Sequence, residues 1–299
     1  MSEVDRLRRF LFEDAPVRGH WVRLARSWIE AREHQVLPTP ALHLLGEALA
    51  AASLLSASLK FTGTLTLQLS GSSGPVSMLV AQSTDTRTIR GVAHVEDEAA
   101  ADTADFAALV AGGRLVVSVE QGGSAAPWQG VVPLQADSLA KSLESYFDVS
   151  EQVPTVIVLA ADEFHAGGLL LQKLPVSGES EAAAAAARDL WEEVVALMTT
   201  VGPTELLSAA PEDLLGSLFA GHDVRLFDGE EVRFACRCDR ERVAAMLRGL
   251  GRGEVESIIS EQGQVSVTCE FCRRPYVFDA VDAAQLFLPG SDPGTASLN

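Results

Sequence analysis

The spacing of apolar residues divides the first 177 residues into helical and strand patterns. Three segments place apolar side chains three or four positions apart, as on one face of a helix, at residues 7–12, 21–32 and 40–58. Short β-branched or apolar segments bounded by Gly, Pro or Asp predict strands instead. The predicted strands are 65–69, 76–81, 89–95, 114–120, 130–134, 156–160 and 168–174. Helical patterns at 105–111 and 138–147 interrupt them, so we expect one α+β domain over residues 1–177 with a largely antiparallel sheet.

A different pattern begins at Gly178 and predicts a helical linker over residues 178–231. Residues 181–201 combine an alanine run with a continuous apolar face, which is typical of a long helix, and a shorter helix is expected over 211–219. The last expected feature of this region is a hairpin, with Asp228-Gly229 as the turn between segments 224–227 and 231–235.

Negative charge is concentrated in this linker. The chain has a formal charge of -18, and residues 178–231 hold twelve acidic but only two basic side chains. Repulsion among these carboxylates, in a helix that buries little apolar area, predicts a linker of marginal stability. An ordinary amphipathic helix with a solvated acidic face gives the same pattern. The overall excess of acid argues against nucleic acid as a partner.

Several classes of function find no support in the chain. Residues 1–9 are charged where a signal peptide is apolar, and no apolar run of about 18 residues follows, so we expect a cytoplasmic protein without membrane contact. Neither a phosphate-binding loop nor a nucleophile elbow is present, so we expect a non-enzymatic, ATP-independent protein. Trp191 and Met198 are expected to be packing residues. The histidines show no ligand spacing and stand at His20, His34, His43, His94, His165 and His222.

All four cysteines fall in a small C-terminal domain that we expect over residues 232–290, followed by a disordered tail over 291–299. They form two pairs, Cys236 with Cys238 and Cys269 with Cys272, and a chain without a secretion signal keeps such pairs reduced. Four thiolates match the tetrahedral preference of Zn²⁺ and leave no position for a catalytic water. We therefore expect one closed zinc site.

The residues around the cysteines predict a small zinc-ribbon-like fold. A strand over 231–238 is expected to lead into the first pair, and Asp239 to begin a helix that continues through Leu247. The remaining expected elements are a helix over 254–260 and strands over 265–268 and 276–278. A unit of this size has a thin core, so metal binding, worth roughly 10 to 16 kcal/mol in small zinc peptides, would supply much of its folding energy.

The spacing of the cysteines alone is also compatible with a purely structural zinc site. Two features indicate a redox-sensitive site instead. Arginines lie beside both pairs, and positive charge favours the thiolate that oxidants attack. Cysteines two residues apart in a strand are also poorly placed for a disulfide, so closing that bond would disturb the backbone. The arginines concerned are Arg237, Arg240, Arg273 and Arg274.

The Cys-x-Cys and Cys-x-x-Cys pairs resemble the signature of the redox-regulated 33 kDa heat-shock chaperonins of bacteria. The resemblance extends from residue 5 to about residue 287, and further segments look like family segments in the family's order. These segments are 9–13, 17–19, 59–61, 90–93, 129–132, 146–147, 150–152 and 166–172.

The resemblance implies a holdase that is inactive while reduced and zinc-bound. It implies that oxidation joins Cys236 to Cys238 and Cys269 to Cys272, that zinc is released, and that the C-terminal domain and linker unfold. Unfolding client proteins would then bind, and the oxidised protein would form a homodimer. Two alternatives stay open: a thiol-disulfide oxidoreductase using Cys269 and Cys272, and a zinc-ribbon module that binds a partner.

Overall fold

The computed structural model describes residues 4–121, 128–134, 137–175 and 181–288. The chain divides into two compact units, Met1–Ala235 and Cys236–Asn299. The first contains the segment expected to be a linker, and the second contains all four cysteines. The predicted tail over 291–299 lies outside the described residues.

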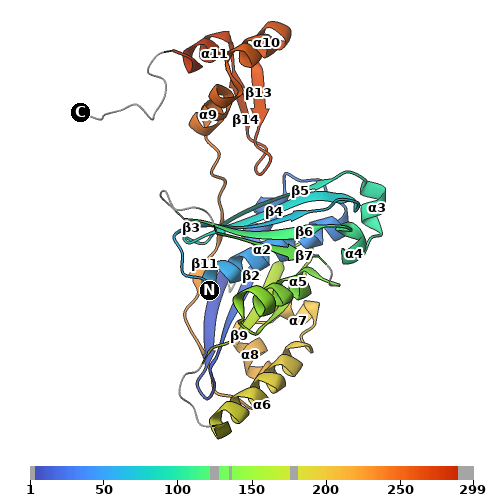
Figure 1. The fold of residues 1–299 in the computed structure, drawn as a ribbon, viewed down its shortest axis with the longest axis vertical. Coiled ribbons are helices and arrows are strands. Elements are labelled where there is room, and N and C mark those ends of the chain that lie inside the picture. The colour runs from blue at the N-terminus through green and yellow to red at the C-terminus, as the bar shows by residue number, and fades with distance from the viewer. Residues whose placement is uncertain (1–3, 122–127, 135–136, 176–180, 289–299) are drawn as a thin grey trace, which may run out of the picture. The chain divides into compact units, whose positions relative to one another are not determined.

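Two antiparallel sheets form the frame of the first unit (Figure 1). One has the strand order β12-β5-β4-β3-β6-β7, and the other has the order β10-β1-β2-β9-β8, with β11 also paired to β1. Only the β12–β5 pair is parallel among the described pairs. The predicted α+β class with antiparallel pairing is therefore confirmed. The strands of the first sheet are β3 (Gly63–Ser70), β4 (Val76–Thr84), β5 (Thr88–Val95), β6 (Arg114–Gln121), β7 (Trp128–Pro133) and β12 (Arg233–Phe234). The strands of the second sheet are β1 (Arg6–Phe12), β2 (Val17–Leu24), β8 (Thr155–Ala161), β9 (Ala166–Lys173), β10 (Val224–Leu226) and β11 (Glu230–Glu231).

Helix α2 (Thr39–Ser58) packs against strands of both sheets and forms the centre of the larger core. Its length and composition would suit a membrane span, but 78% of the apolar window is buried inside the unit. Glycine at position 91 lets β5 approach the helix, because a Cβ there would lie 2.9 Å from Leu45 Cδ1. The shorter helices around this core are α1 (Arg26–Arg32), α3 (Glu98–Asp102), α4 (Phe106–Leu109) and α5 (Leu139–Tyr146), with a π-helical turn, η1 (Phe147–Glu151).

The second sheet is covered on both faces. Alternate residues of β2 divide between the cores: Val22 and Leu24 belong to the core around α2, whereas Trp21 belongs to a second core on the opposite face. Helices α6 (Glu181–Met198), α7 (Pro203–Ser208) and α8 (Pro211–Leu218) complete this second core. Val194 and Met198 are fully buried there, as the apolar face of the predicted helix requires.

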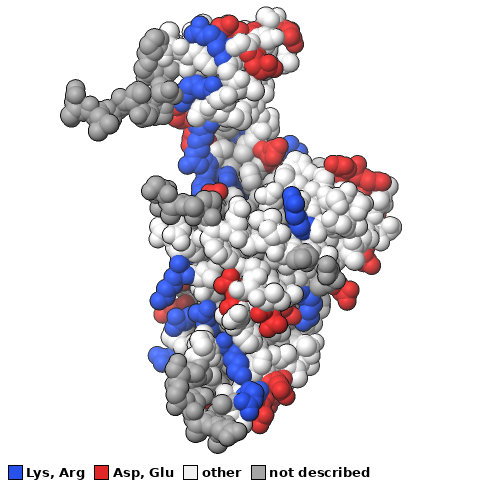
Figure 2. Space-filling view, in the orientation of Figure 1, with Lys and Arg blue, Asp and Glu red and all other residues white. Residues whose placement is uncertain are grey.

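Basic residues of the sheets meet the acidic linker. Arg8 pairs with Glu212 on α8, and Arg87 Nε lies 2.8 Å from Glu230 Oε2. The guanidinium of Arg23 donates to the carbonyl oxygens of Leu207, at 3.4 Å, and Ala209, at 2.8 Å. Figure 2 shows basic and acidic side chains side by side over the part of the first unit that contains these helices. The excess negative charge of the linker is thus partly balanced by its docking surface.

Three predictions near the sheet edges were wrong. Residues 7–12 form β1 and not a helix, and of residues 21–32 only the second half is helical, as α1. Asp228-Gly229 does not turn a hairpin. Strands β10 and β11 both pair with β1, so these two residues interrupt one edge strand. The side chains of Arg6 and Arg8 donate to the carbonyl oxygens of Gly229 and Phe227 and hold the interruption open.

The second unit is a two-stranded hairpin with three helices. Strand β13 (Val265–Thr268) pairs antiparallel with β14 (Pro275–Phe278), as predicted. Asp239 caps the first helix through a hydrogen bond from the Arg242 amide at 2.8 Å, also as predicted. The helices are α9 (Arg240–Leu250), α10 (Arg252–Gln262) and α11 (Ala280–Leu286), the last of which the sequence pattern did not predict.

Candidate metal centre

The second cysteine pair lies in a tight loop at the end of the β13–β14 hairpin. Thr268 and Pro275 form the last register pair, and residues 269–274 connect them. The Cys269 amide donates to the Arg274 carbonyl at 3.0 Å, and the Arg273 amide donates to the Cys269 carbonyl at 2.8 Å. Arg273 has φ of 54°, in the left-handed region that non-glycine residues seldom occupy. These constraints turn both thiols of the loop toward one point.

The first pair follows an irregular segment. The predicted strand over 231–238 is regular only at Glu231 and at Arg233–Phe234, so Cys236 and Cys238 lie outside regular secondary structure. Helix α9 begins two residues after Cys238 and anchors it, because the Arg242 guanidinium donates to the Arg237 carbonyl at 2.7 Å. The two pairs therefore meet across the loop from separate elements.

All four sulfur atoms lie within 4.8 Å of one another. The Sγ atom of Cys236 is 3.4 Å from that of Cys238 and 3.6 Å from that of Cys269. The Sγ atom of Cys238 is 3.3 Å from that of Cys272. Four sulfurs at about 2.3 Å from a tetrahedral zinc ion would be about 3.8 Å apart. The four thiols thus have the number, the chemistry and nearly the spacing of a closed zinc site. All four are free thiols in the structure, with no disulfide among them.

The thiols perturb one another strongly. Burial raises the pKa of Cys272 to about 12, with hydrogen bonds among the thiols adding to the effect, and burial also raises the pKa of Cys236. Burial acts in the same direction on Cys238, but the Tyr276 hydroxyl and the neighbouring thiols outweigh it and lower its pKa to about 7. The surroundings therefore favour the thiolate at Cys238 over the thiolate at Cys236 or Cys272, and the thiolate is the nucleophilic form of a cysteine.

Tyr276 is a site residue that the spacing of the cysteines did not indicate. Its hydroxyl is buried and has no well-formed hydrogen bond among the described residues, although it lies beside Cys238. A thiolate at Cys238, as metal binding requires, gives this hydroxyl an acceptor. The strand alternation indicated only that its side chain is buried, because Tyr276 and Phe278 are the two inward positions of β14.

The predicted arginines do not all serve the sulfurs. Arg274 lies close to the cluster: the Tyr276 hydroxyl, followed by the Cys238 and Cys272 sulfurs, raises its pKa. Arg240 is directed elsewhere, with one nitrogen 2.8 Å from the Val277 carbonyl and another 2.8 Å from Asp282 Oδ2. Its guanidinium also stacks on the Phe278 ring.

The core of the second unit is small. In the part of this unit that the structure describes, eight buried residues form the core, and Cys238 and Cys269 pack against its margin. Loss of the sulfur cluster would therefore remove part of the packing as well as the cross-links. The eight residues are Ala244, Leu247, Val255, Val265, Tyr276, Phe278, Ala283 and Leu286.

Comparison with known proteins agrees with this fold. A family model described as "Hsp33 protein" matches residues 5–279. The 33 kDa chaperonin of Nitrosococcus oceani is 42% identical over 287 residues, covering 96% of each chain. That of Methylobacillus flagellatus is 40% identical over 298 residues, covering 98% of this chain and 99% of the relative.

A solved structure is similar in fold. The crystal structure of the 33 kDa chaperonin from Thermotoga maritima matches with a TM-score of 0.78 and 28% identity, covering 94% of this chain and 97% of that one. The two-unit fold and the chaperonin relatives define the protein as a molecular chaperone. The chain belongs to the Hsp33 family, as the resemblance in its sequence indicated.

Proposed function

We propose that the chain is an ATP-independent holdase that binds unfolding proteins once its four cysteines are oxidised. The proposal rests mainly on the convergence of Cys236, Cys238, Cys269 and Cys272 within 4.8 Å, in a unit whose described part has only eight buried core residues. A unit with so little apolar burial depends on its cross-links. Any reaction that modifies the sulfurs would therefore also destabilise the fold of this unit.

In the reduced state the four thiolates would hold one Zn²⁺. When bound, this ion would join two otherwise separate backbone segments and supply folding energy. Tyr276 would donate its hydroxyl hydrogen bond to the Cys238 thiolate, and the Arg274 guanidinium would offset part of the negative charge. The reduced unit is thus folded, and the chaperone is inactive.

Oxidation destroys the ligand set. In each pair, the two thiolates give two electrons to one hydrogen peroxide molecule, which takes up two protons from the solvent and is released as two waters, and a disulfide joins the two sulfurs. We propose the disulfide pairing that the family resemblance implies, Cys236 with Cys238 and Cys269 with Cys272. Disulfide sulfurs are poor zinc ligands, since the thiolate is the binding form. The protein would then have no metal site, and the small core of the second unit would lose the cross-links that stabilise it.

The linker transmits this loss to the first unit. Helices α6–α8 cover one face of the β1-β2-β9-β8 sheet, where Met198 and Leu206 are fully buried. Undocking of these helices exposes two complementary apolar surfaces, one on the helices and one on the sheet. Surfaces of this kind bind unfolded polypeptides without sequence specificity and also allow two copies to associate. We accordingly propose unfolded proteins as clients, an oxidised homodimer, and a cytoplasmic location.

The test compares the reduced and the peroxide-treated full-length protein. Light scattering of a thermally unfolding client should fall only in the presence of the oxidised protein. Zinc content and free thiols are measured on the same samples, and we expect zinc loss and disulfide formation to parallel activity. Equal suppression of aggregation by both forms would contradict the switch.

A further inference from the structure

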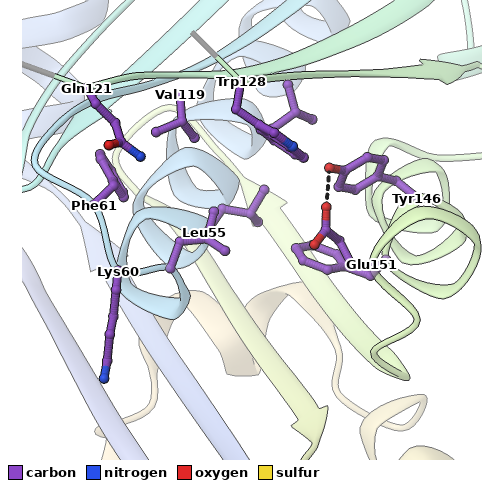
Figure 3. Close-up of a pocket in the computed structure, with 11 residues that line it drawn as sticks. Leu55, Lys60, Phe61, Val119, Gln121, Trp128, Tyr146 and Glu151 are labelled. Carbon is purple, nitrogen blue, oxygen red and sulfur yellow. Dashed lines mark hydrogen bonds between the residues drawn. The ribbon is translucent and has the colours of Figure 1, made fainter. Parts of the chain in front are cut away.

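A pocket of about 170 Å³ opens in the first unit, where the end of α2, strands β6 and β7 and helix α5 meet (Figure 3). The end of α2 and strand β6 supply its floor, which is apolar and buried. Leu55 and Val117 are at most 1% exposed, and Val119 is 6% exposed. The pocket is therefore a formed cavity with an apolar base.

Aromatic side chains form one wall of the pocket. Trp128 on β7 meets Tyr146 edge-to-face at a centroid distance of 6.1 Å, and Tyr146 meets Phe147 in the same way at 5.5 Å. The Tyr146 hydroxyl donates to Glu151 Oε1 at 2.7 Å. Gly130 keeps room for the ring, because a Cβ there would lie 2.6 Å from Tyr146 Cε2. The wall is preorganised, yet Trp128 remains 42% exposed.

The segment behind this wall is unusual. Helix α5 continues into the π-helical turn η1, which ends at Gln152 with φ of 54°. Single π-helical turns occur often at functional sites, and a left-handed non-glycine residue stores backbone strain. The turn places Glu151 on the pocket lining, opposite the apolar floor.

Charges of both signs lie at the mouth, with Lys60, Arg87 and Asp85 lining it and Arg87 paired with Glu230. The pocket joins a second hollow, and the two share Leu59, Lys60, Phe61 and Gln121. Figure 3 shows Lys60 extending away from the aromatic wall, with its ammonium group outside the pocket. Among the described residues this ammonium has no ion-pair partner, in a chain of net charge -18. A ligand with a negative charge beside its apolar group would complement both regions.

We infer that this pocket is a subsite for one large apolar side chain of an extended client segment, with an acidic residue of the same segment placed at Lys60. A cavity of comparable size, about 150 Å³, accepts one benzene molecule, so the pocket admits one side chain but no helix or strand. The inference rests on the proposed holdase function and names part of its client surface. A single buried side chain holds a client weakly, which is consistent with an inactive state in which the subsite is already open.

The experiment uses the full-length reduced protein with labelled Leu and Val methyl groups. The probe is a blocked pentapeptide that contains one Phe and one Glu, and its partner peptide has Gln in place of Glu. NMR titration should shift the methyl signals of Leu55, Val117 and Val119. The Glu peptide should bind about two- to fivefold more tightly at low salt, the range expected for one exposed ion pair.

Two variants decide the assignment. Val119→Phe fills the cavity and should abolish the shifts. Lys60→Glu leaves the core untouched and should reverse the preference for the Glu peptide, even if the filled variant fails to fold. Arg26→Glu is the matched control, because Arg26 is 85% exposed on α1 and carries the same charge change. It should leave the preference as it was.

Other results would overturn the inference. Shifts confined to other methyl groups would place the peptide elsewhere, and shifts that grow with protein concentration alone would make a second copy the occupant. An unchanged preference in Lys60→Glu would remove the acidic residue from the assignment. These outcomes are independent of the redox switch, because peptide binding here is measured on the reduced form, whereas the switch is tested by aggregation in both forms.

Discussion

The ring of Phe10 on β1 lies over Gly19, its register partner on β2, so closely that a Cβ on Gly19 would stand 2.1 Å from Phe10 Cζ. Phe10 is fully buried and also contacts Phe219, which follows α8, at a centroid distance of 6.3 Å. Gly19 therefore determines where Phe10 sits, and Phe10 is part of the surface on which the linker docks.

Replacing this glycine should destabilise the first unit. Gly19→Ala forces the Phe10 ring out of place in a packed core, which costs about 1 to 3 kcal/mol. The free energy of unfolding, from urea titration followed by circular dichroism, checks this value. Gly216→Ala is the control: nothing lies within 4 Å of the added Cβ in α8, so stability should rise by about 0.4 to 1 kcal/mol. An unchanged free energy of unfolding in Gly19→Ala would show that the Phe10 ring can be accommodated elsewhere in the core without cost.

Weakening the linker's packing should lower the threshold for activation. Met198→Ala removes a fully buried side chain of α6 and should cost about 2 to 5 kcal/mol of linker docking. Less peroxide, or a lower temperature, should then suffice to suppress client aggregation. Glu192→Ala, on the exposed face of the same helix, should behave like the unmodified protein. If both variants require the same oxidant dose, docking of α6 does not limit activation.

Removing one sulfur should separate metal binding from oxidation. Cys269→Ser leaves three thiols and a core that has lost a packing partner, so zinc content should fall well below one ion per chain. The second unit should then be cleaved rapidly by trypsin, because its arginines no longer lie in folded structure, and activity should not depend on peroxide. Stoichiometric zinc in this variant would exclude Cys269 as a ligand.

Acid should destabilise the first unit through His20. This side chain is 2% exposed, and burial, together with Arg18, Arg87 and Arg9, lowers its pKa to about 3. An unfolded histidine has a pKa near 6.5, so between about pH 6.5 and pH 3 the unfolded state binds the extra proton and stability falls as the pH falls. The loss is on the order of 5 kcal/mol when complete.

The measurement is the free energy of unfolding across this pH range. His20→Gln should flatten its dependence on pH, whereas His34→Gln, with a side chain that is 37% exposed, should leave the dependence unchanged. Equal slopes in the unmodified protein and in His20→Gln would show that other groups account for the acid sensitivity.

The regular elements around the larger core could be predicted from the sequence. Most of them bury mainly one face, and this gives a periodic pattern of apolar residues. Strands β3 and β4 show alternating apolar residues or are bounded by turn residues, and α2 has apolar residues at helical spacing. The strand β1 was predicted as a helix because Leu7 faces one core and Phe10 and Phe12 face the other. A strand buried on both faces loses its alternation, and the remaining spacing resembles that of a helix.

The site shows the same limit. The four cysteines could be predicted as a cluster because their pair spacing is itself the signal. Tyr276 could not, since a tyrosine on an inward strand position looks like any core residue until the loop brings Cys238 beside it. The Asp228-Gly229 pair likewise suited a turn. It forms no hairpin because the segments on either side of it pair with β1, more than 200 residues earlier in the chain.

The backbone between α8 and the first cysteine runs along the edges of both sheets. The amide of Val232 donates to Asp5, that of Arg233 to Arg87 and that of Ala235 to Ile89, at 2.9, 3.0 and 3.1 Å. In the proposed switch, these three backbone hydrogen bonds would keep this segment attached to the sheets after the cysteine unit has unfolded. The strength of a segment without any cysteine would then help to determine how readily the protein is activated.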